Sequence, residues 1–230
     1  METTVIKDTD ALRRSCIFAS LREDELNRLA EVARVRTYQR AQIVAHPGER
    51  ADACFLVARG GIRAYRLSPK GHEVTLECVG AGDIYCLALV GRVTAWDNFV
   101  EATSDGTVVY HIPLKAVEKL CLTSPSRALA AIQVLSHRLE EARDRIEDLA
   151  LYDVKARLAH ALGRLAAERS EQVIAATHRE LAWLIGARPE AVTRALAELT
   201  REGLVGNRSD PARIHVLDFQ GLMSYGGRPS

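Results

Sequence analysis

The sequence is poor in aromatic residues and contains no long apolar run. Aromatic residues make up 5% of the 230 residues, and no apolar stretch approaches the roughly 20 residues that a membrane-spanning helix needs. The N-terminus, METTVIKDTD, lacks the basic and apolar regions of a signal peptide. The five cysteines are odd in number and irregularly spaced, which argues against a disulfide framework. We therefore expect a cytoplasmic protein with reduced thiols and no membrane partner.

The sequence also lacks an excess of charge of either sign. Lys and Arg number 31 against 30 Asp and Glu, so the formal net charge is +1. Any contact with nucleic acid must therefore come from a local patch rather than from the whole surface. We find no paired nucleophile and base, phosphate-binding loop or cluster of metal ligands, so nothing in the sequence predicts an enzyme.

Residues 1–112 are predicted to form a β-rich domain preceded by a helix. Ser20 and Glu23 have the spacing of a capping box at the start of that helix. From Arg36 to Ile112, short runs rich in Val, Ile, Tyr and Phe alternate with turn residues, which predicts a compact β sandwich or roll. Two of these runs flank SPKG at 68–71 and predict a hairpin. The residues expected on its exposed face are Arg63, Arg66, Thr75 and Glu77.

Residues 113–152 are predicted to form a dimerisation helix that ends in a hinge. Ser124 is a plausible cap, and Pro125 suits a first helical position. Apolar residues then follow in steps of three and four: Ile132, Leu135, Leu139, Ala142, Ile146 and Leu149. Charged residues flank this seam, which favours a parallel dimer over a stripe packed on its own domain. LYDV at 151–154 interrupts the pattern and is the candidate hinge.

Residues 153–230 are predicted to form a winged helix-turn-helix domain. Thr177 and Glu180 form a capping box, Gly186 supplies a turn, and Pro189 starts a second helix. The apolar face of that helix is Val192, Ala195, Leu196 and Leu199, and the opposite face is Glu190, Thr193, Arg194 and Ala197. Two short strands at 203–205 and 213–216 would form the wing. This arrangement suits a helix that reads DNA bases, and the alternative is an ordinary pair of packed helices.

The order of β roll, long helix and winged helix-turn-helix resembles a family of bacterial transcription regulators. This family includes the cyclic-AMP receptor protein and the fumarate–nitrate regulator, and the resemblance is carried by HRELAWLIGARPEAVTRALAELTREGLV, GDIYCLALVG and FVEATSDGTVVYHIP. It implies an α+β fold whose N-terminal roll is jelly-roll-like and of the cyclic-nucleotide-binding type. It also implies a homodimer that binds double-stranded DNA, works with RNA polymerase and responds to a small-molecule effector. The alternative is that no effector exists, in which case the chain would bind DNA constitutively, with control by its abundance.

The resemblance also implies which residues read DNA. Glu190, Thr193 and Arg194 fall where the oxygen-sensing branch carries Glu-x-x-Ser-Arg, which predicts a half-site resembling TTGAT. The carboxylate can accept a hydrogen bond from cytosine, and the Arg fork can bind guanine. Further candidate DNA contacts are Thr177, Arg179, Arg188, Arg201, Arg208 and Arg213, for which a solvated surface side chain is the alternative.

The roll departs from the family's known ligand sites. Leu87 stands where cyclic-nucleotide binders carry Glu, and Trp96-Asp97 falls near their Arg-Ser pair, so cyclic AMP is not expected. Only Cys16 lies near the region that supplies iron–sulfur ligands, so a cluster is not expected either. We instead expect an apolar effector pocket that includes Cys86, Leu87, Leu89, Trp96 and Phe99.

Cys86 leaves three interpretations open. It falls on the thiolate ligand position of the carbon-monoxide-sensing haem branch, although Ala88 replaces the histidine expected two residues later. The candidate partners for a haem at Cys86 are His46, His72 and His111. A thiol redox sensor and a buried small apolar residue are the other interpretations.

Overall fold

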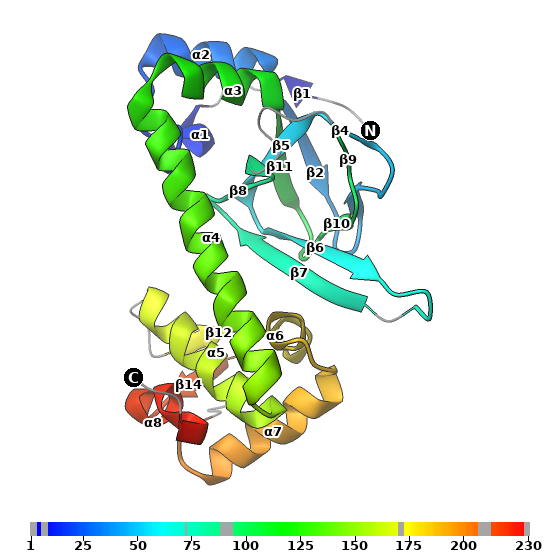
Figure 1. Cartoon of the computed structure of the whole chain (residues 1–230), viewed down its shortest axis with the longest axis vertical. Coiled ribbons are helices and arrows are strands. Elements are labelled where there is room, and N and C mark those ends of the chain that lie inside the picture. Colours follow the sequence, from blue (N-terminus) through cyan, green and yellow to red (C-terminus); the bar gives the residue numbers. More distant parts are fainter. Residues whose placement is uncertain are drawn as a thin grey trace. The chain divides into compact units, whose positions relative to one another are not determined.

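The computed structural model describes residues 4–5, 9–71, 73–87, 94–169, 173–206 and 213–227. The chain divides into two units, residues 1–139 and 140–230 (Figure 1). The boundary between the units lies inside the predicted dimerisation helix. The predicted division into 1–112, 113–152 and 153–230 stays a prediction.

The N-terminal unit is a β roll with helices at both of its chain ends. Its strands form two main antiparallel sheets, ordered β1-β2-β11-β5-β8 and β3-β10-β6-β7, and a small β4-β9 pair. In chain order the elements are β1 (Thr4–Val5), α1 (Asp10–Arg14), α2 (Glu23–Val32), β2 (Arg34–Tyr38), β3 (Ile43–Ala45), β4 (Arg50–Ala51), β5 (Ala53–Arg59), β6 (Gly61–Leu67), β7 (Glu73–Gly80), β8 (Ile84–Tyr85), β9 (Thr94–Ala95), β10 (Phe99–Ala102), β11 (Thr107–Pro113), α3 (Leu114–Thr123) and α4 (Pro125–Leu151). The predicted α+β class and roll are confirmed.

Two hydrophobic cores hold the roll in place. One core lies between the sheet that contains β11 and the helices, and Leu12, Phe18 and Leu26 pack there with Tyr110 and Ile112. The N-terminal helical segment thus covers one side of the roll. The second core fills the roll itself and is aromatic, with Phe55, Tyr85 and Trp96 buried.

The predicted start of the N-terminal helix was wrong by two residues. Helix α2 begins at Glu23, and its N-cap residue is Arg22 rather than Ser20. The Arg22 amide donates to the Glu25 carboxylate at 3.0 Å, so Glu25 takes the role that the spacing had given to Glu23. Several acidic residues follow one another here, and the sequence does not distinguish which one caps the helix.

The predicted hairpin around SPKG is confirmed, but one residue of its predicted exposed face is buried. Strands β6 and β7 pair with Leu67 opposite Glu73. Arg63 is buried because β10 pairs with the other edge of β6 and places Glu101 opposite it. Its guanidinium donates to Glu101 and to Glu73, each at 2.7 Å. Strand β6 is therefore an inner strand, and its charged residue is an internal ion pair rather than a solvated surface group.

Helix α4 leaves most of its apolar stripe open in the single chain. It begins at Pro125, as predicted, and runs to Leu151. Leu135 packs against the helix-side core of the N-terminal unit. The exposed members of the stripe are Ile132, Leu139, Ala142, Ile146 and Leu149.

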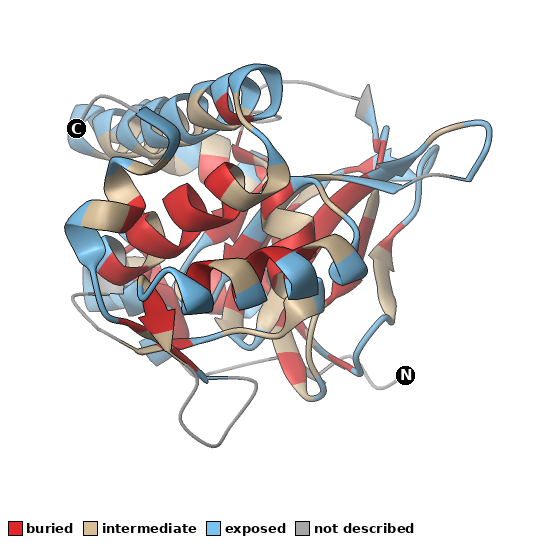
Figure 2. Ribbon diagram, turned by 90° about the horizontal axis from the view of Figure 1, so that it is seen from below, coloured by how far each residue is buried: buried red, intermediate tan, exposed pale blue. Residues whose placement is uncertain are grey.

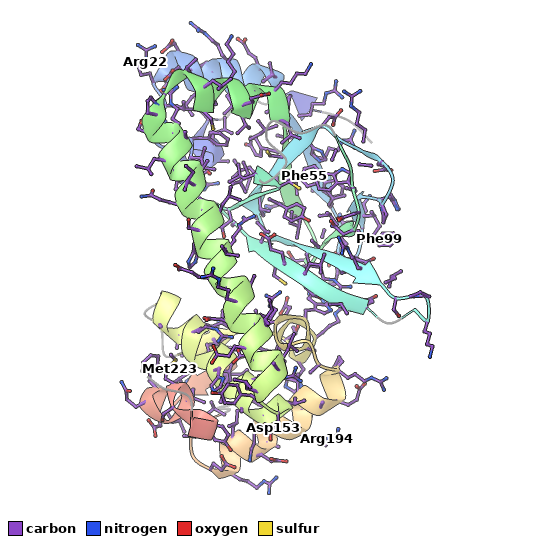
Figure 3. All side chains as sticks on the ribbon, in the orientation of Figure 1. Arg22, Phe55, Phe99, Asp153, Arg194 and Met223 are labelled. Carbon is purple, nitrogen blue, oxygen red and sulfur yellow. The ribbon has the colours of Figure 1, made fainter. Side chains whose placement is uncertain are left out.

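The helical path stops at the predicted interruption and starts again. Tyr152 and Asp153 are non-helical, and α5 begins at Val154. The Asp153 carboxylate accepts from the Ala156 amide at 2.9 Å, which satisfies a free N–H at the start of α5 (Figure 3). The break at 152–153 is confirmed, and its action as a hinge stays a prediction.

The C-terminal unit is a helical bundle with a small sheet, and its helices combine buried with exposed residues (Figure 2). Its elements are α5 (Val154–Arg169), β12 (Val173–Ala175), α6 (His178–Ile185), α7 (Pro189–Arg201), β13 (Val205–Gly206), β14 (Arg213–Val216), α8 (Phe219–Met223) and a 3-10 turn at Tyr225–Gly227. The sheet order is β12-β14-β13. The winged helix-turn-helix is confirmed, and β12 is a third strand that the sequence pattern did not reveal.

A buried polar network joins the last turns of α4 to the rest of this unit. Asp148 accepts from His160 Nδ1 at 2.9 Å and from Arg164 Nη2 at 3.0 Å. The other ring nitrogen of His160 lies 2.8 Å from the carbonyl oxygen of Tyr225. Each ring nitrogen of His160 therefore faces a hydrogen-bond acceptor within the buried network.

Candidate functional site

The candidate site is the helix-turn-helix formed by α6 and α7. Helix α6 starts at Thr177, whose hydroxyl accepts from the Glu180 amide at 3.2 Å while its own amide donates to the Glu180 carboxylate at 2.7 Å. The helix ends at Gly186, which has a φ of 62° and a left-handed conformation. A Cβ at this glycine would lie 3.2 Å from a methyl carbon of Leu149. Both the backbone angle and the tight space therefore favour glycine at the turn.

Helix α7 presents its predicted DNA-reading face to solvent. It begins at Pro189, with Arg188 at the N-cap. The buried residues of the helix are Val192, Ala195, Leu196 and Leu199. The exposed residues include all three predicted base readers, Glu190, Thr193 and Arg194, of which Figure 3 labels Arg194. The sequence thus places a carboxylate, a hydroxyl and a guanidinium on one accessible side of a helix held by an apolar core.

Thr193 is the one base reader with a side-chain partner among the described residues of this unit. Its hydroxyl oxygen lies 2.8 Å from Nδ1 of His178, the first residue of α6. The same hydroxyl donates to the backbone oxygen of Pro189 at 3.0 Å. Sequence reasoning missed His178 as a site residue, because fifteen positions separate it from Thr193.

The other predicted DNA contacts lie in different surroundings. The Thr177 hydroxyl is occupied in the capping box. Arg179 is exposed, and its guanidinium lies over the ring of Trp183, 5.2 Å from the ring centre, as in a cation–π contact. Arg188 is exposed at the start of α7. Arg201 and Arg213 are also exposed, and Arg208 lies outside the described residues. As phosphate contacts, these residues stay predictions.

Comparison with known proteins agrees with this arrangement over almost the whole chain. Residues 156–225 match the Crp-like helix-turn-helix domain, and residues 35–124 match the cyclic nucleotide-binding domain. The transcriptional regulator SdrP of Thermus thermophilus is 30% identical over 203 residues, which cover 84% of this chain and 95% of that protein. The chain belongs to the Crp/Fnr family of transcription regulators.

Two further proteins extend the comparison. The cyclic AMP receptor protein of Thermus thermophilus is 29% identical over 208 residues, which cover 89% of this chain and 94% of that protein. A structure of a CooA variant from Carboxydothermus hydrogenoformans superposes with a TM-score of 0.73 at 21% identity and covers 97% of each chain. The likeness to the CooA structure shows the fold alone. The relatives are transcription regulators, so the protein is a DNA-binding regulator with a cyclic-nucleotide-binding-type domain.

The predicted effector residues of this Crp/Fnr regulator do not all lie in one core. Trp96 is buried in the aromatic core, with ring-centre distances of 5.0 Å to Phe55 and 5.9 Å to Tyr85, and Cys86 packs beside that core. Leu87 belongs to the other core, between sheet and helices. Phe99 stacks on Tyr65 at 5.2 Å. Leu89 lies outside the described residues. A single pocket that contains all five predicted residues stays a prediction.

Two thiols of the roll, those of Cys54 and Cys86, lie in surroundings that oppose ionisation. Burial raises the pKa of Cys86, and the neighbouring Cys54 thiol and Glu77 raise it further. Burial likewise raises the pKa of Cys54 to about 12. Cys86 also has a φ of 76°, a left-handed conformation that is rare outside glycine. Because the thiolate is the form that binds metals and reacts with oxidants, this environment disfavours both roles for Cys86.

The histidines proposed as partners of Cys86 are differently placed. His111 is held by Tyr38, whose hydroxyl lies 2.9 Å from Nε2, and burial lowers the pKa of the imidazole to about 4. The ring of His46 lies edge-on to Phe99 at 5.9 Å. His72 lies outside the described residues. Among the residues that the structure describes, no group of three or more His, Cys, Asp or Glu side chains is arranged to hold a metal ion.

The described helices include none that is long and apolar enough to cross a membrane. Helix α4 carries an exposed apolar stripe, which alternates with charged residues such as Arg143 and Glu147. An apolar stripe with charged flanks suits association with another helix.

Proposed function

We propose that this Crp/Fnr regulator binds a two-fold symmetric operator as a homodimer, with one α7 helix of each subunit in the major groove. The observation that carries the proposal is the common exposure of Glu190, Thr193 and Arg194 on the side of α7 opposite its buried face. A carboxylate accepts from the cytosine amino group, and an arginine fork binds guanine O6 and N7. We expect half-sites resembling TTGAT, with centres one helical turn apart.

The exposed stripe of α4 supports the homodimer. Ile132, Leu139 and Ile146 are more than half exposed, at 57%, 55% and 68%. They recur every seven residues, so they line one side of the helix as a coiled-coil seam requires. A second copy of the same helix, parallel to the first, would bury these side chains and satisfy the two-fold symmetry of the proposed operator.

The roll is the proposed place of effector control. Arg138 of α4 donates to the backbone oxygen of Ile84 in β8 and pairs with Glu77 of β7. An effector that displaces β8 would therefore move α4, and the break at 152–153 would transmit the change to α5. Such control requires unequal affinity of the effector for the two arrangements.

The residues of the roll favour an effector other than cyclic AMP. Asp97, an exposed carboxylate that pairs with Arg66, stands where the resemblance expects the phosphate-binding pair. The raised pKa of Cys86 opposes a thiolate-ligated haem. We therefore propose a predominantly apolar small molecule, with RNA polymerase as the protein partner at the promoter. A Soret band in the absorption spectrum of the purified protein would contradict this choice.

Selection of DNA from a random-sequence pool tests the base-reading face. Wild type is expected to enrich a palindrome, and Arg194→Ala is expected to lose the preference for one base pair in each half-site, because each such contact contributes about 1–3 kcal/mol of discrimination. Arg201→Ala is the matched control, since it removes the same charge from the same helix. It should weaken binding to all sequences alike and reduce the salt dependence. Unchanged enrichment by Arg194→Ala would remove the assignment.

Sedimentation equilibrium tests the dimer. Ile132→Glu places a charge on the apolar stripe and is expected to give monomers that bind the selected palindrome weakly. Gln133→Glu adds the same charge at the next, exposed position and should leave the dimer intact. If both variants remain dimers, α4 does not form the interface. Ligand-free wild type that already binds its palindrome at full affinity would instead indicate a constitutive regulator.

A further inference from the structure

The contact between His178 and Thr193 restricts what Thr193 can offer to DNA. A threonine hydroxyl has one proton to donate and two lone pairs that accept. Here it donates to the Pro189 carbonyl at 3.0 Å and lies 2.8 Å from Nδ1 of His178. If His178 carries its proton on Nδ1, the hydroxyl accepts from it, and otherwise the hydroxyl donates to it. In both arrangements the hydroxyl proton is directed to the protein.

The methyl group remains as the outward part of the side chain. Thr193 lies on the exposed side of α7, and its Cβ carries only the hydroxyl and the methyl. A threonine in a helix divides its time between two rotamers when nothing holds its hydroxyl. Either arrangement keeps the hydroxyl oxygen beside Nδ1 of His178 and so selects one rotamer, which gives the methyl group one direction relative to Glu190 and Arg194.

His178 contributes through one ring nitrogen only. Its Nε2 atom is buried and has no hydrogen-bond partner among the described residues. An unsatisfied buried polar atom destabilises a fold, so stability alone favours a phenyl ring at this position. The imidazole is then explained by the Nδ1 contact to Thr193, which lies on the surface that faces DNA.

We propose that His178 is a positioning residue for base recognition, which holds Thr193 so that its methyl group contacts the methyl group of a thymine. The inference rests on the proposed DNA-reading role of α7 and goes beyond it in assigning His178 and the chemistry of the contact. Threonine methyl against thymine methyl is one of the direct contacts available in the major groove. The partner is therefore a 5-methyl group, not a base acceptor.

Deoxyuridine substitution tests the contact from the DNA side. The probe is the duplex that wild type enriches from a random pool, with each thymine replaced in turn by deoxyuridine in both half-sites. Loss of one buried methyl group corresponds to about a fourfold weaker binding per half-site. We expect one thymine of each half-site to show this loss with wild type. Thr193→Val keeps the methyl group and should keep the loss, and Thr193→Ser should abolish it.

Variants of His178 test the positioning role. His178→Phe keeps the ring shape but lacks Nδ1, so it should reduce the deoxyuridine effect to below about twofold. His178→Asn places an amide donor near the Nδ1 position and should restore the effect. In the Thr193→Val background, His178→Phe should change nothing further, because valine has no hydroxyl to hold and is stiff at χ1. Thermal unfolding of each variant confirms that the fold is intact.

The outcomes separate the inference from the proposed function. If wild type enriches no sequence, the DNA-reading assignment itself fails. If it enriches a palindrome in which no thymine is sensitive, or if Thr193→Val loses the sensitivity, the methyl contact fails. If His178→Phe keeps full sensitivity, or reduces it equally in the Thr193→Val background, the positioning role fails. The expected pattern across all variants supports the whole inference.

Discussion

Replacement of Asp148 by alanine is expected to destabilise the C-terminal unit by about 3 kcal/mol. The carboxylate side chain is 5% exposed and accepts hydrogen bonds from His160, which is 1% exposed, and from Arg164, which is 29% exposed. Hydrogen bonds to charged groups contribute about 1.5–3 kcal/mol each. The bond to His160 is counted in full, and that to Arg164 is discounted because water reaches its guanidinium. The expected loss is a large part of the free energy of unfolding of a domain, which is roughly 5–15 kcal/mol.

The chain has a natural reporter for this measurement. It contains two tryptophans, Trp96 in the roll and Trp183 in α6. In a Trp96→Phe background, the fluorescence of Trp183 follows the C-terminal unit alone during urea denaturation. With an m value of about 1–1.5 kcal/mol per molar urea for a unit of this size, Asp148→Ala should lower the midpoint by roughly 2–3 M.

Glu147→Gln provides the matched control. Glu147 is the preceding residue of α4 and is exposed, so its substitution removes the same charge and should change the stability by less than about 0.5 kcal/mol. Equal midpoints for Asp148→Ala and Glu147→Gln would show that the network carries no net stabilisation. The reasoning from burial and hydrogen bonds would then be refuted.

Three further predictions concern the roll, and the fluorescence of Trp96 in a Trp183→Phe background reports the first two. Arg63→Ala should destabilise the roll by about 3–5 kcal/mol, because Glu101 is left buried without its partner. Arg66→Ala on the same strand removes an exposed ion pair and should destabilise the roll by less than about 1 kcal/mol. The pKa of His111 is lowered to about 4 in the folded chain, so stability should fall as pH drops from about 6.5 towards 4. The slope should be at most about 1.4 kcal/mol per pH unit. His111→Gln should flatten this slope, and an unchanged slope would show that His111 is not its source. Labelling of the native protein with a disulfide reagent should be fast at the exposed thiols of Cys16 and Cys78. It should be slow at Cys54 and Cys86, whose thiol pKa values are raised. Fast labelling of Cys54 and Cys86 would contradict these pKa shifts.

Local signals in the sequence predicted the helix-turn-helix well. The capping box at Thr177, the turn at Gly186 and the helix start at Pro189 each depend on residues within one turn of the chain. The two faces of α7 follow from its period, and the structure confirms both. These features need no knowledge of distant contacts, which is why spacing alone was sufficient.

The features that the sequence could not reveal depend on pairing between distant segments. Arg63 reads as a solvated charge until β10 is known to pair with β6 and to place Glu101 opposite it. Strand β12 is three residues long and gains its identity only from β14. His178 reads as an ordinary first-turn residue until α7 crosses α6 and brings Thr193 to its ring. In each case the chemistry of the residue is set by a partner that no local pattern encodes.

The continuity of α4 constrains how this regulator can tolerate insertions. The two units divide between Leu139 and Glu140, inside an uninterrupted helix rather than in a loop. One inserted residue there would rotate everything after it by about 100° around the axis and place Ile146 out of phase with Ile132. Additions of seven residues would nearly preserve the phase, whereas the hairpin tip at 68–71 could accept almost any length. With α4 as the proposed dimer seam, a chimera with another regulator is therefore expected to need a junction in heptad steps.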